Sequence, residues 1–407
     1  MPLGKAVETV ARVYFLAVMF LMYFFIEEAV YIGGIGITLR HVFALLLIAS
    51  AFVYFIIKPD VARAAVSLKS AFVFAVPLLV VIVASMLVWV IDKSDVSTIM
   101  RGISGCVIYT NWLSCALCAG AALYVFGKSG IWYNLAAIVA SNIVMIVRIM
   151  LTDGIGKFFS EFITLVASFA GKTGETIVKA EIHELAFCLG AYIIYMLYKP
   201  QKKLWFWVLF GLSSFCFLAA FKRIALIAMA VVAAVRGVLW LFGRLSDGAV
   251  SRAANAVSIL SVVLLVAYVA VIKADVFSML ERAGIDTSGR AYVYSHVSKY
   301  YSFSPSFVGN GIGFLTYQLN EVVSLGVSAV HNDFLQFYID LGFFGYILWL
   351  LSMTLLRTKY FGRNADADTA VVTTLLTTVM GVIIMGNGYE KNVSEQRERY
   401  GMEPQTI

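Results

Sequence analysis

Three residues whose types could carry out chemistry, His331-Asn332-Asp333, directly precede an apolar run. Asn332 or Asp333 is a suitable N-cap for a helix that begins there, and either would place His331 beside the helix N-terminus. The helix macrodipole opposes protonation at that end, and a neutral imidazole can accept a proton from a hydroxyl nucleophile. His331 is therefore a candidate general base, and a structural hydrogen-bonding histidine is the alternative.

One basic pair suits the binding of a phosphate group, whereas Arg290 by itself indicates little. Lys222 and Arg223 lie together in a very short turn between two apolar runs, and Arg290 ends the segment 286–290. A guanidinium group offers a planar fork of donors that matches the oxygens of a phosphate. The alternative for Lys222 and Arg223 is an anchor at lipid head groups. The glycines of 309–313 follow no strand of a βαβ unit, so this segment indicates a turn rather than a dinucleotide loop.

A third candidate is the segment Glu181-Ile182-His183-Glu184, which begins another apolar run. Carboxylates around a histidine suit substrate hydroxyls or acid/base work, but carboxylates also compensate the dipole of a helix N-terminus. The second histidine of a zinc H-E-x-x-H motif is missing. The cysteines all lie in apolar runs, and Cys115-x-x-Cys118 is typical of helix packing. We expect no metal site and no cofactor.

The composition indicates the class of protein in which these residues lie. Of the 407 residues, 61% are hydrophobic and 14% are charged, against roughly 25% charged in soluble domains. This excludes a soluble globular enzyme and indicates a polytopic membrane protein. The net charge is +7, but the basic residues form small clusters between apolar runs rather than a binding patch, which argues against a nucleic-acid partner.

The apolar runs predict an all-α, polytopic integral membrane helical bundle of about eleven transmembrane helices, because a span needs about 20 apolar residues. We expect residues 1–407 to form a single integral membrane domain. The predicted spans centre on residues 11–31, 37–57, 70–91, 102–126, 131–151, 184–199, 204–221, 224–242, 254–273, 342–356 and 368–387.

The basic residues between the spans predict a cytoplasmic N-terminus, because Lys and Arg gather in inner connections. The short outer connection 27–36 has none of them. Two long connections, 152–183 and 274–341, then face outward, and the second is the large extracytoplasmic loop. Its aromatic side chains suit sugar rings, and docking of the loop on the bilayer interface is the alternative. No two-halves repeat is visible, which disfavours a transporter built from inverted repeats.

The order and spacing of these motifs resemble the O-antigen ligase and Wzy-type polysaccharide polymerase superfamily over residues 180–360. The resemblance rests on the Lys222-Arg223 turn, Ser288-Gly289-Arg290, Gly309-Asn310-Gly311-Ile312-Gly313, His331-Asn332-Asp333-Phe334-Leu335-Gln336 and Gly342-Phe343-Phe344-Gly345. The His-Asn block is the most specific of them.

The resemblance implies a metal-independent glycosyltransferase with a large periplasmic or extracellular loop. Such enzymes transfer a glycan from a polyprenyl diphosphate carrier to an acceptor hydroxyl without a nucleotide sugar. Carried over by position, Arg223 and Arg290 resemble the arginines that bind the donor diphosphate, with Lys222 beside them, and His331 resembles the histidine that activates the acceptor. Asn332, Glu181 and His183 are further candidates for substrate binding.

The segment 181–187 and the Phe-Lys-Arg-Ile turn look more like capsule and exopolysaccharide polymerases than like lipid A-core ligases, which more often carry Ser-Arg at the turn. We therefore expect a polymerase that extends O-antigen, capsule or exopolysaccharide chains. The alternatives are an O-antigen ligase and a lipid-linked oligosaccharide flippase. The expected place is the bacterial cytoplasmic (inner) membrane, with the active site outside the cytoplasm. The expected partners are a polyprenyl-diphosphate-linked oligosaccharide, membrane lipid, a chain-length regulator and a flippase.

Overall fold

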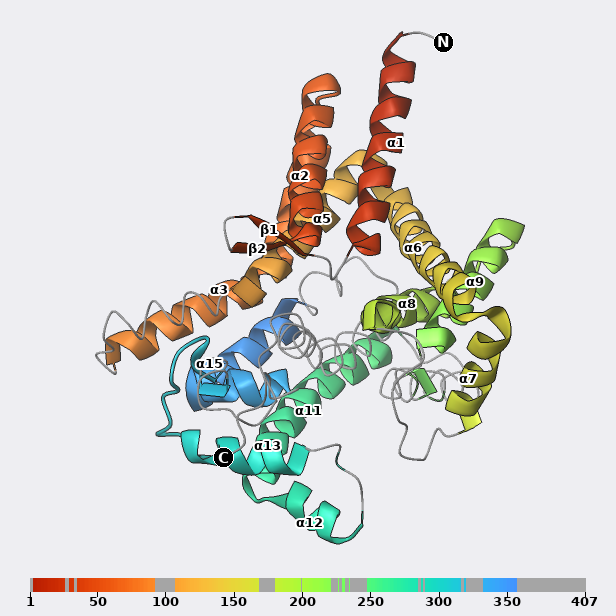
Figure 1. Ribbon diagram of the computed structural model, residues 1–407. Coiled ribbons are helices and arrows are strands. Elements are labelled where there is room, and N and C mark those ends of the chain that lie inside the picture. Colours follow the sequence, from red (N-terminus) through yellow and green to blue (C-terminus); the bar gives the residue numbers. More distant parts are fainter. Residues whose placement is uncertain are drawn as a thin grey trace. The chain divides into compact units, whose positions relative to one another are not determined.

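The described part of the chain is almost entirely helical (Figure 1). The computed structural model describes residues 3–25, 29–32, 35–91, 107–167, 180–198, 200–220, 226, 229–230, 234, 247–284, 287, 290–315, 318–319 and 332–356. The predicted helical class is confirmed. One feature was not predicted: the short connection 27–36 contains most of an antiparallel hairpin of β1 (Ala29–Ile32) and β2 (Ile35–Thr38).

The helices follow the apolar runs of the sequence. They are α1 (Leu3–Phe24), α2 (Leu39–Ile57), α3 (Val61–Ile91), α5 (Val107–Phe126), α6 (Gly130–Asp153), α7 (Ile155–Ala167), α8 (Ala180–Tyr198), α9 (Leu204–Ala220), α11 (Asp247–Lys273), α12 (Val276–Arg282), α13 (Arg290–Val297) and α15 (Asp333–Leu356), with short 3₁₀ turns η1 (Gly127–Ser129) and η2 (Ser298–Tyr300).

Several of these helices are long and apolar enough to cross a membrane. Among the described residues, 4 qualify as single spans, and up to 6 qualify if each bent helix pair counts as one span. A multi-pass membrane protein is therefore supported, and the number of about eleven spans stays a prediction. The predicted span at 368–387 lies outside the described residues, and the one at 224–242 lies largely outside them.

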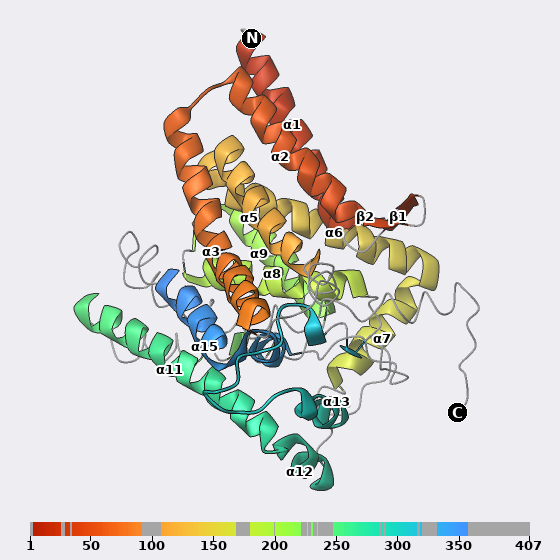
Figure 2. The ribbon, with the colours of Figure 1, turned by 90° about the vertical axis from the view of Figure 1, so that its left-hand side faces the viewer.

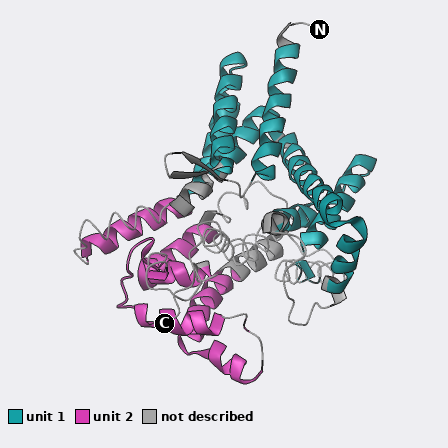
Figure 3. Cartoon of the chain, in the orientation of Figure 1, with its two compact units in different colours: residues 1–75, 111–245 teal, residues 76–110, 246–407 magenta. Residues whose placement is uncertain are grey.

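The chain forms two compact units, coloured separately in Figure 3. Unit 1 comprises residues 1–75 and 111–245, and unit 2 comprises residues 76–110 and 246–407. In unit 1, α1 packs along α2 and α6 (Figure 2). Apolar side chains of α1, α2 and α5 form its core, including Phe15, Met19, Leu47 and Val125. The expectation of a single membrane domain over 1–407 stays a prediction.

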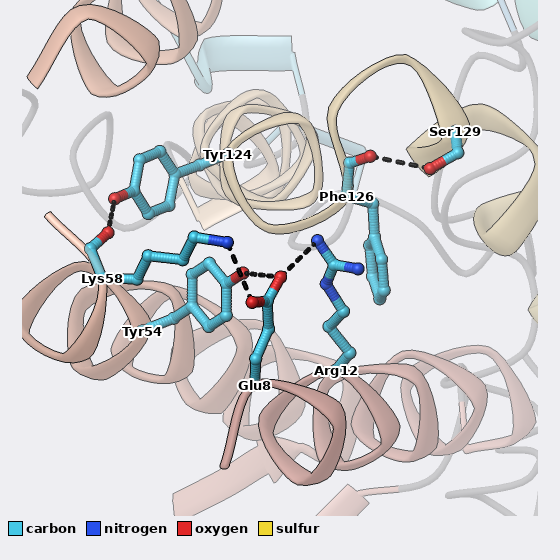
Figure 4. A network of polar contacts seen from close by, with 7 residues as sticks. All are labelled: Glu8, Arg12, Tyr54, Lys58, Tyr124, Phe126 and Ser129. Atoms are coloured by element: carbon cyan, nitrogen blue, oxygen red, sulfur yellow. Dashed lines mark hydrogen bonds and ion pairs between the residues drawn. The ribbon is translucent and has the colours of Figure 1, made fainter. Parts of the chain in front are cut away.

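A polar network centred on Glu8 joins helices at one end of unit 1 (Figure 4). The Glu8 carboxylate accepts hydrogen bonds from the Tyr54 hydroxyl at 3.1 Å and from Lys58 Nζ at 2.8 Å, and it pairs with Arg12 at 2.9 Å. The bond to Glu8 raises the pKa of Lys58. Tyr124 donates its hydroxyl to the Lys58 carbonyl oxygen at 2.9 Å. The network therefore ties the start of α1 to the end of α2 and to the end of α5.

In unit 2, α11 packs against α15, and α12 turns back onto α13. The chain bends by 61° between α11 and α12. The last part of α3 also belongs to this unit. α15 is broken inside: Gly342 has φ 72° and ψ −178°, outside the helical region. The predicted span 342–356 therefore begins at the break, whereas the helix begins at Asp333, within the predicted loop 274–341.

Candidate functional site

Asn332 caps the N-terminus of α15. Its Oδ1 accepts the backbone N–H of Leu335 at 3.2 Å, and its carbonyl oxygen accepts the N–H of Gln336 at 3.0 Å. This is the geometry of an N-cap residue, which satisfies a helix N–H that has no partner inside the helix. Of the two caps that the sequence offers, the structure selects Asn332. The candidate base His331 directly precedes this cap and lies outside the described residues.

The amide nitrogen of Asn332 joins two further helices. Its Nδ2 donates to the Tyr268 hydroxyl at 3.2 Å and to the Tyr294 hydroxyl at 3.1 Å. Tyr268 comes from α11 and Tyr294 from α13. Asn332 is 7% exposed and Tyr294 3%, so these bonds are formed away from solvent. We call Asn332, Tyr268 and Tyr294 the amide cluster.

Arg290 is the first residue of α13, one helical turn before Tyr294. Residues four apart lie on the same side of a helix, so Arg290 shares a helix side with the Tyr294 of the amide cluster. The Arg290 guanidinium also interacts electrostatically with the Tyr268 hydroxyl. The structure therefore brings two residues that the sequence singled out, Arg290 and Asn332, to one place in unit 2. Tyr294 connects the helix that carries Arg290 to Asn332.

The N-terminus of α13 is held by Thr287. The Thr287 hydroxyl oxygen accepts the N–H of Ala291 at 3.2 Å, while the Thr287 carbonyl oxygen accepts the N–H of Arg290 at 3.2 Å. The same hydroxyl donates to the Glu281 carboxylate of α12. This cap fixes the residue at which α13 starts, and hence the position of Arg290 on it.

The other end of α13 is held by Lys273, the last residue of α11. Lys273 Nζ donates to the carbonyl oxygens of Ser298 at 2.6 Å and Tyr301 at 2.8 Å, and it lies 4.7 Å from the centre of the Tyr301 ring. Burial raises the pKa of the Tyr301 hydroxyl, which therefore stays neutral. α13 is thus fastened at both ends, which limits the movement of Arg290 and Tyr294.

The glycine-rich segment 307–313 docks onto the break in α15. The N–H of Asn310 donates to Ile339 O at 3.1 Å, the N–H of Gly311 to Asp340 O at 2.7 Å, and the N–H of Phe343 to Phe307 O at 2.9 Å. These bonds satisfy backbone groups that the break removes from the helix ladder. The predicted turn is confirmed, since Gly309, Gly311 and Gly313 all have positive φ. Its docking partner was not predicted.

Asp340 holds the same segment from within α15. It is fully buried, at 0% exposed. Its carboxylate accepts the backbone N–H of Gly313 at 3.3 Å and of Leu315 at 3.4 Å, and it is hydrogen-bonded by the Gln336 side chain. Sequence reasoning missed Asp340, although a carboxylate among the apolar residues of a candidate span is a signal for a role.

The remaining predicted site residues have no described side chains. Lys222, Arg223 and His331 lie outside the described residues. Glu181 and His183 lie in the first turn of α8, as predicted, but the structure describes only their backbone. Tyr268 was missed, and its signal was a lone hydroxyl near the end of an apolar run. Within the described ranges, no group of three or more His, Cys, Asp or Glu side chains is arranged to hold a metal ion.

Comparison with known proteins identifies one domain. Residues 208–350 match the family model described as O-antigen ligase. A search of curated proteins and a search of solved structures each found no match to the chain. The matched stretch contains Arg290, Asn332, Tyr268 and Tyr294, and it supports a membrane enzyme of the glycan-transferring type. The match at residues 208–350 thus confirms the predicted resemblance to the O-antigen ligase and Wzy-type superfamily.

Proposed function

We propose that this protein is a polysaccharide polymerase that transfers a growing glycan from a polyprenyl diphosphate to a hydroxyl of an incoming lipid-linked repeat unit. The acceptor oxygen forms a bond to the anomeric carbon of the donor glycan. The bond from that carbon to the diphosphate oxygen breaks, and its electron pair leaves with the polyprenyl diphosphate. The acceptor proton passes to a base of the protein.

The observation that carries the proposal is the hydrogen bond between Asn332, at the N-terminus of α15, and Tyr294 of α13, the helix that begins with Arg290. A leaving diphosphate gains negative charge, and a fixed guanidinium group stabilises it best where little water screens the interaction. Asn332 directly follows His331 in the chain and is hydrogen-bonded to the helix that carries Arg290. This contact supports a donor site in which Arg290 stabilises the leaving group and the segment that begins α15 supplies the base.

The other roles are assigned from the family pattern. His331 is the proposed base, and Arg223 with Lys222 completes the binding of the diphosphate. Glu181 and His183 are proposed to contact substrate hydroxyls, and Asn332, predicted as a further substrate-binding residue, acts on the substrate through the two tyrosines that its amide holds. The segment 181–187 and the Phe-Lys-Arg-Ile turn favour polymerisation over ligation to lipid A-core. The proposed setting is the bacterial cytoplasmic membrane, with the loop 274–341 outside the cytoplasm, and a chain-length regulator and a flippase as partners.

The test is glycan transfer by the purified full-length protein in proteoliposomes. Wild type, Arg290→Ala, Arg290→Lys and His331→Ala are incubated with synthetic polyprenyl-diphosphate repeat units, and the products are separated by length. We expect a ladder of products from wild type. Loss of Arg290 or His331 should lower the rate by on the order of 100-fold or more, since each removes a contact made in the transition state. Arg290→Lys keeps the charge but loses the planar fork, so an intermediate rate is expected.

Other products point to other functions. If wild type makes no ladder but attaches glycan to an added lipid A-core acceptor, the protein is a ligase. If it makes no bond but moves labelled lipid-linked oligosaccharide across the bilayer, it is a flippase. If both alanine variants still make the ladder, the protein is a polymerase, but the assignment of Arg290 and His331 to its site is refuted.

A further inference from the structure

The amide cluster has a hydrogen-bond donor that its own members do not use. The two hydrogens of the Asn332 amide go to the oxygens of Tyr268 and Tyr294. Each tyrosine hydroxyl therefore accepts a bond and still carries its own hydrogen. The two hydroxyls also interact with each other, which can use only one of their two hydrogens. Among the described residues, neither hydroxyl donates to a carbonyl oxygen or a carboxylate, so at least one donor is left.

The direction of these bonds matters. An asparagine amide nitrogen can only donate, and its oxygen is already used to cap α15. Asn332 therefore forces both tyrosines to act as acceptors toward it, and it turns their hydrogens away from itself. A buried hydroxyl with an unused hydrogen is costly unless an acceptor arrives. The arrangement therefore suits a ligand that brings an oxygen acceptor.

The charge beside the cluster indicates which acceptor. Arg290 lies one turn before Tyr294 and interacts electrostatically with the Tyr268 hydroxyl. A guanidinium group attracts an anion, and the oxygens of a diphosphate accept bonds from cations and hydroxyls alike. Hydroxyl donors add directional bonds to the charge of Arg290 without a further positive charge to desolvate.

We propose that the Tyr268 and Tyr294 hydroxyls, held in place by Asn332, donate a hydrogen bond to a diphosphate oxygen of the lipid donor bound at Arg290. This inference rests on the proposed function, because it names a further part of the same donor site. It assigns Tyr268 and Tyr294 to donor binding and makes Asn332 the residue that positions them.

The test measures binding of geranylgeranyl diphosphate, which carries no sugar, to the full-length protein in nanodiscs. The variants are Tyr268→Phe, Tyr294→Phe, the double variant and Tyr338→Phe. Tyr338 is the matched control: it is fully buried in unit 2, and its hydroxyl donates to the Ser302 carbonyl oxygen at 3.0 Å, outside the amide cluster. We expect the Kd of the double variant to rise roughly 10- to 100-fold, the range for one hydrogen bond to a charged group. The control should stay within about twofold of wild type.

A second variant separates a binding role from a folding role. Asn332→Asp keeps the oxygen that caps α15, but its carboxylate accepts hydrogen bonds and so draws both tyrosine hydrogens toward itself. We expect Asn332→Asp to keep the thermal unfolding temperature of wild type and to bind the diphosphate at least 10-fold more weakly. Equal Kd values for wild type, the double variant and Asn332→Asp would overturn the proposal.

The same samples distinguish this inference from the proposed function. If wild type transfers glycan while the tyrosine variants bind the diphosphate as wild type does, only this inference fails. If wild type binds the diphosphate and the tyrosine variants do not, yet wild type makes no glycosidic bond, the binding site stands and the polymerase proposal fails. A sugar-bearing donor gives a further comparison. If all variants bind this donor as tightly as wild type does, the tyrosine hydroxyls do not contact the diphosphate, and the inference is refuted.

Discussion

At the scale of single residues, the site depends on the two different roles of the Asn332 amide. Its oxygen starts α15 and its nitrogen holds two tyrosines from other helices. A leucine or an alanine at this position would lose both functions, whereas a serine would keep only the cap. One amide therefore links the start of a helix to the geometry of the site.

The corresponding prediction concerns stability. Asn332→Ala removes the cap and leaves a buried N–H of α15 without its acceptor, which should lower the free energy of unfolding by about 1–2 kcal/mol. Asn332→Ser should recover most of that loss, because a serine oxygen also caps helices. Unfolding of the purified protein in detergent, followed by circular dichroism, measures both variants. Equal stability of the alanine variant and wild type would contradict the capping role.

At the scale of elements, the break in α15 and the segment 307–313 form one structural feature. Gly342 and Gly309 approach so closely that a Cβ on Gly342 would lie 2.1 Å from Val308 O, and a Cβ on Gly309 would lie 2.4 Å from Gly342 N. Both glycines have positive φ. Glycine is required at both positions, because any side chain would meet backbone atoms that cannot move aside.

We predict that Gly342→Ala is strongly destabilising. The backbone of Gly342, at φ 72° and ψ −178°, is adopted almost only by glycine and alone costs an alanine on the order of 1–3 kcal/mol, and the contact with Val308 O adds to it. The control is Gly211→Ala in α9, where a Cβ meets nothing within 4 Å; alanine there should be neutral or stabilising, because it favours a helix. Thermal unfolding of the two variants gives the comparison. A Gly342→Ala protein as stable as Gly211→Ala would show that the break is not needed.

A second prediction at this scale concerns Asp340. Replacing it with leucine leaves the N–H groups of Gly313 and Leu315 without their acceptor, at about 1–3 kcal/mol for each buried group. Asp340→Asn keeps one acceptor oxygen and should be milder. Limited proteolysis within 301–313 is the readout, because this segment should become accessible in the leucine variant before the helices unfold. If cleavage of Asp340→Leu is the same as that of wild type, the Asp340 carboxylate does not hold this segment in place.

The elements also show what the sequence can and cannot predict. The Asn332 cap was predictable because capping depends on residues next to one another in the chain. The Gly309 turn was predictable for the same reason. The docking of that turn on Gly342 joins residues far apart in sequence, and the predicted start of the last described span fell on the break because hydropathy does not register a single altered φ. Tyr268 was missed because one hydroxyl in an apolar run does not change its pattern.

At the scale of the whole molecule, the predicted topology determines which end of each helix faces the cytoplasm. In unit 1, the Glu8 network gathers the start of α1, the end of α2 and the end of α5 (Figure 4). This agrees with helices that alternate in direction along the chain. The basic residues of that end, Arg12 and Lys58, favour the cytoplasmic side.

The topology prediction is tested by labelling single cysteines in a variant whose native cysteines are replaced. Cysteine at Lys202, in the connection between α8 and α9, should react only after the cytoplasmic side is opened to a membrane-impermeant maleimide. Cysteine at Lys299, within the predicted outer loop, should react in intact cells. Both side chains are exposed, so access to the reagent depends on the side of the membrane. The opposite labelling pattern would invert the predicted orientation.

The docked break in α15 also restricts the order of biogenesis. A helix entering the bilayer with a break at Gly342 carries backbone groups that hydrocarbon cannot satisfy. Their partners lie in residues 307–311, which leave the ribosome before α15 does. The segment that supplies these partners is therefore already synthesised when α15 enters the bilayer. This part of the chain can fold during translation, before the residues that follow α15 are made.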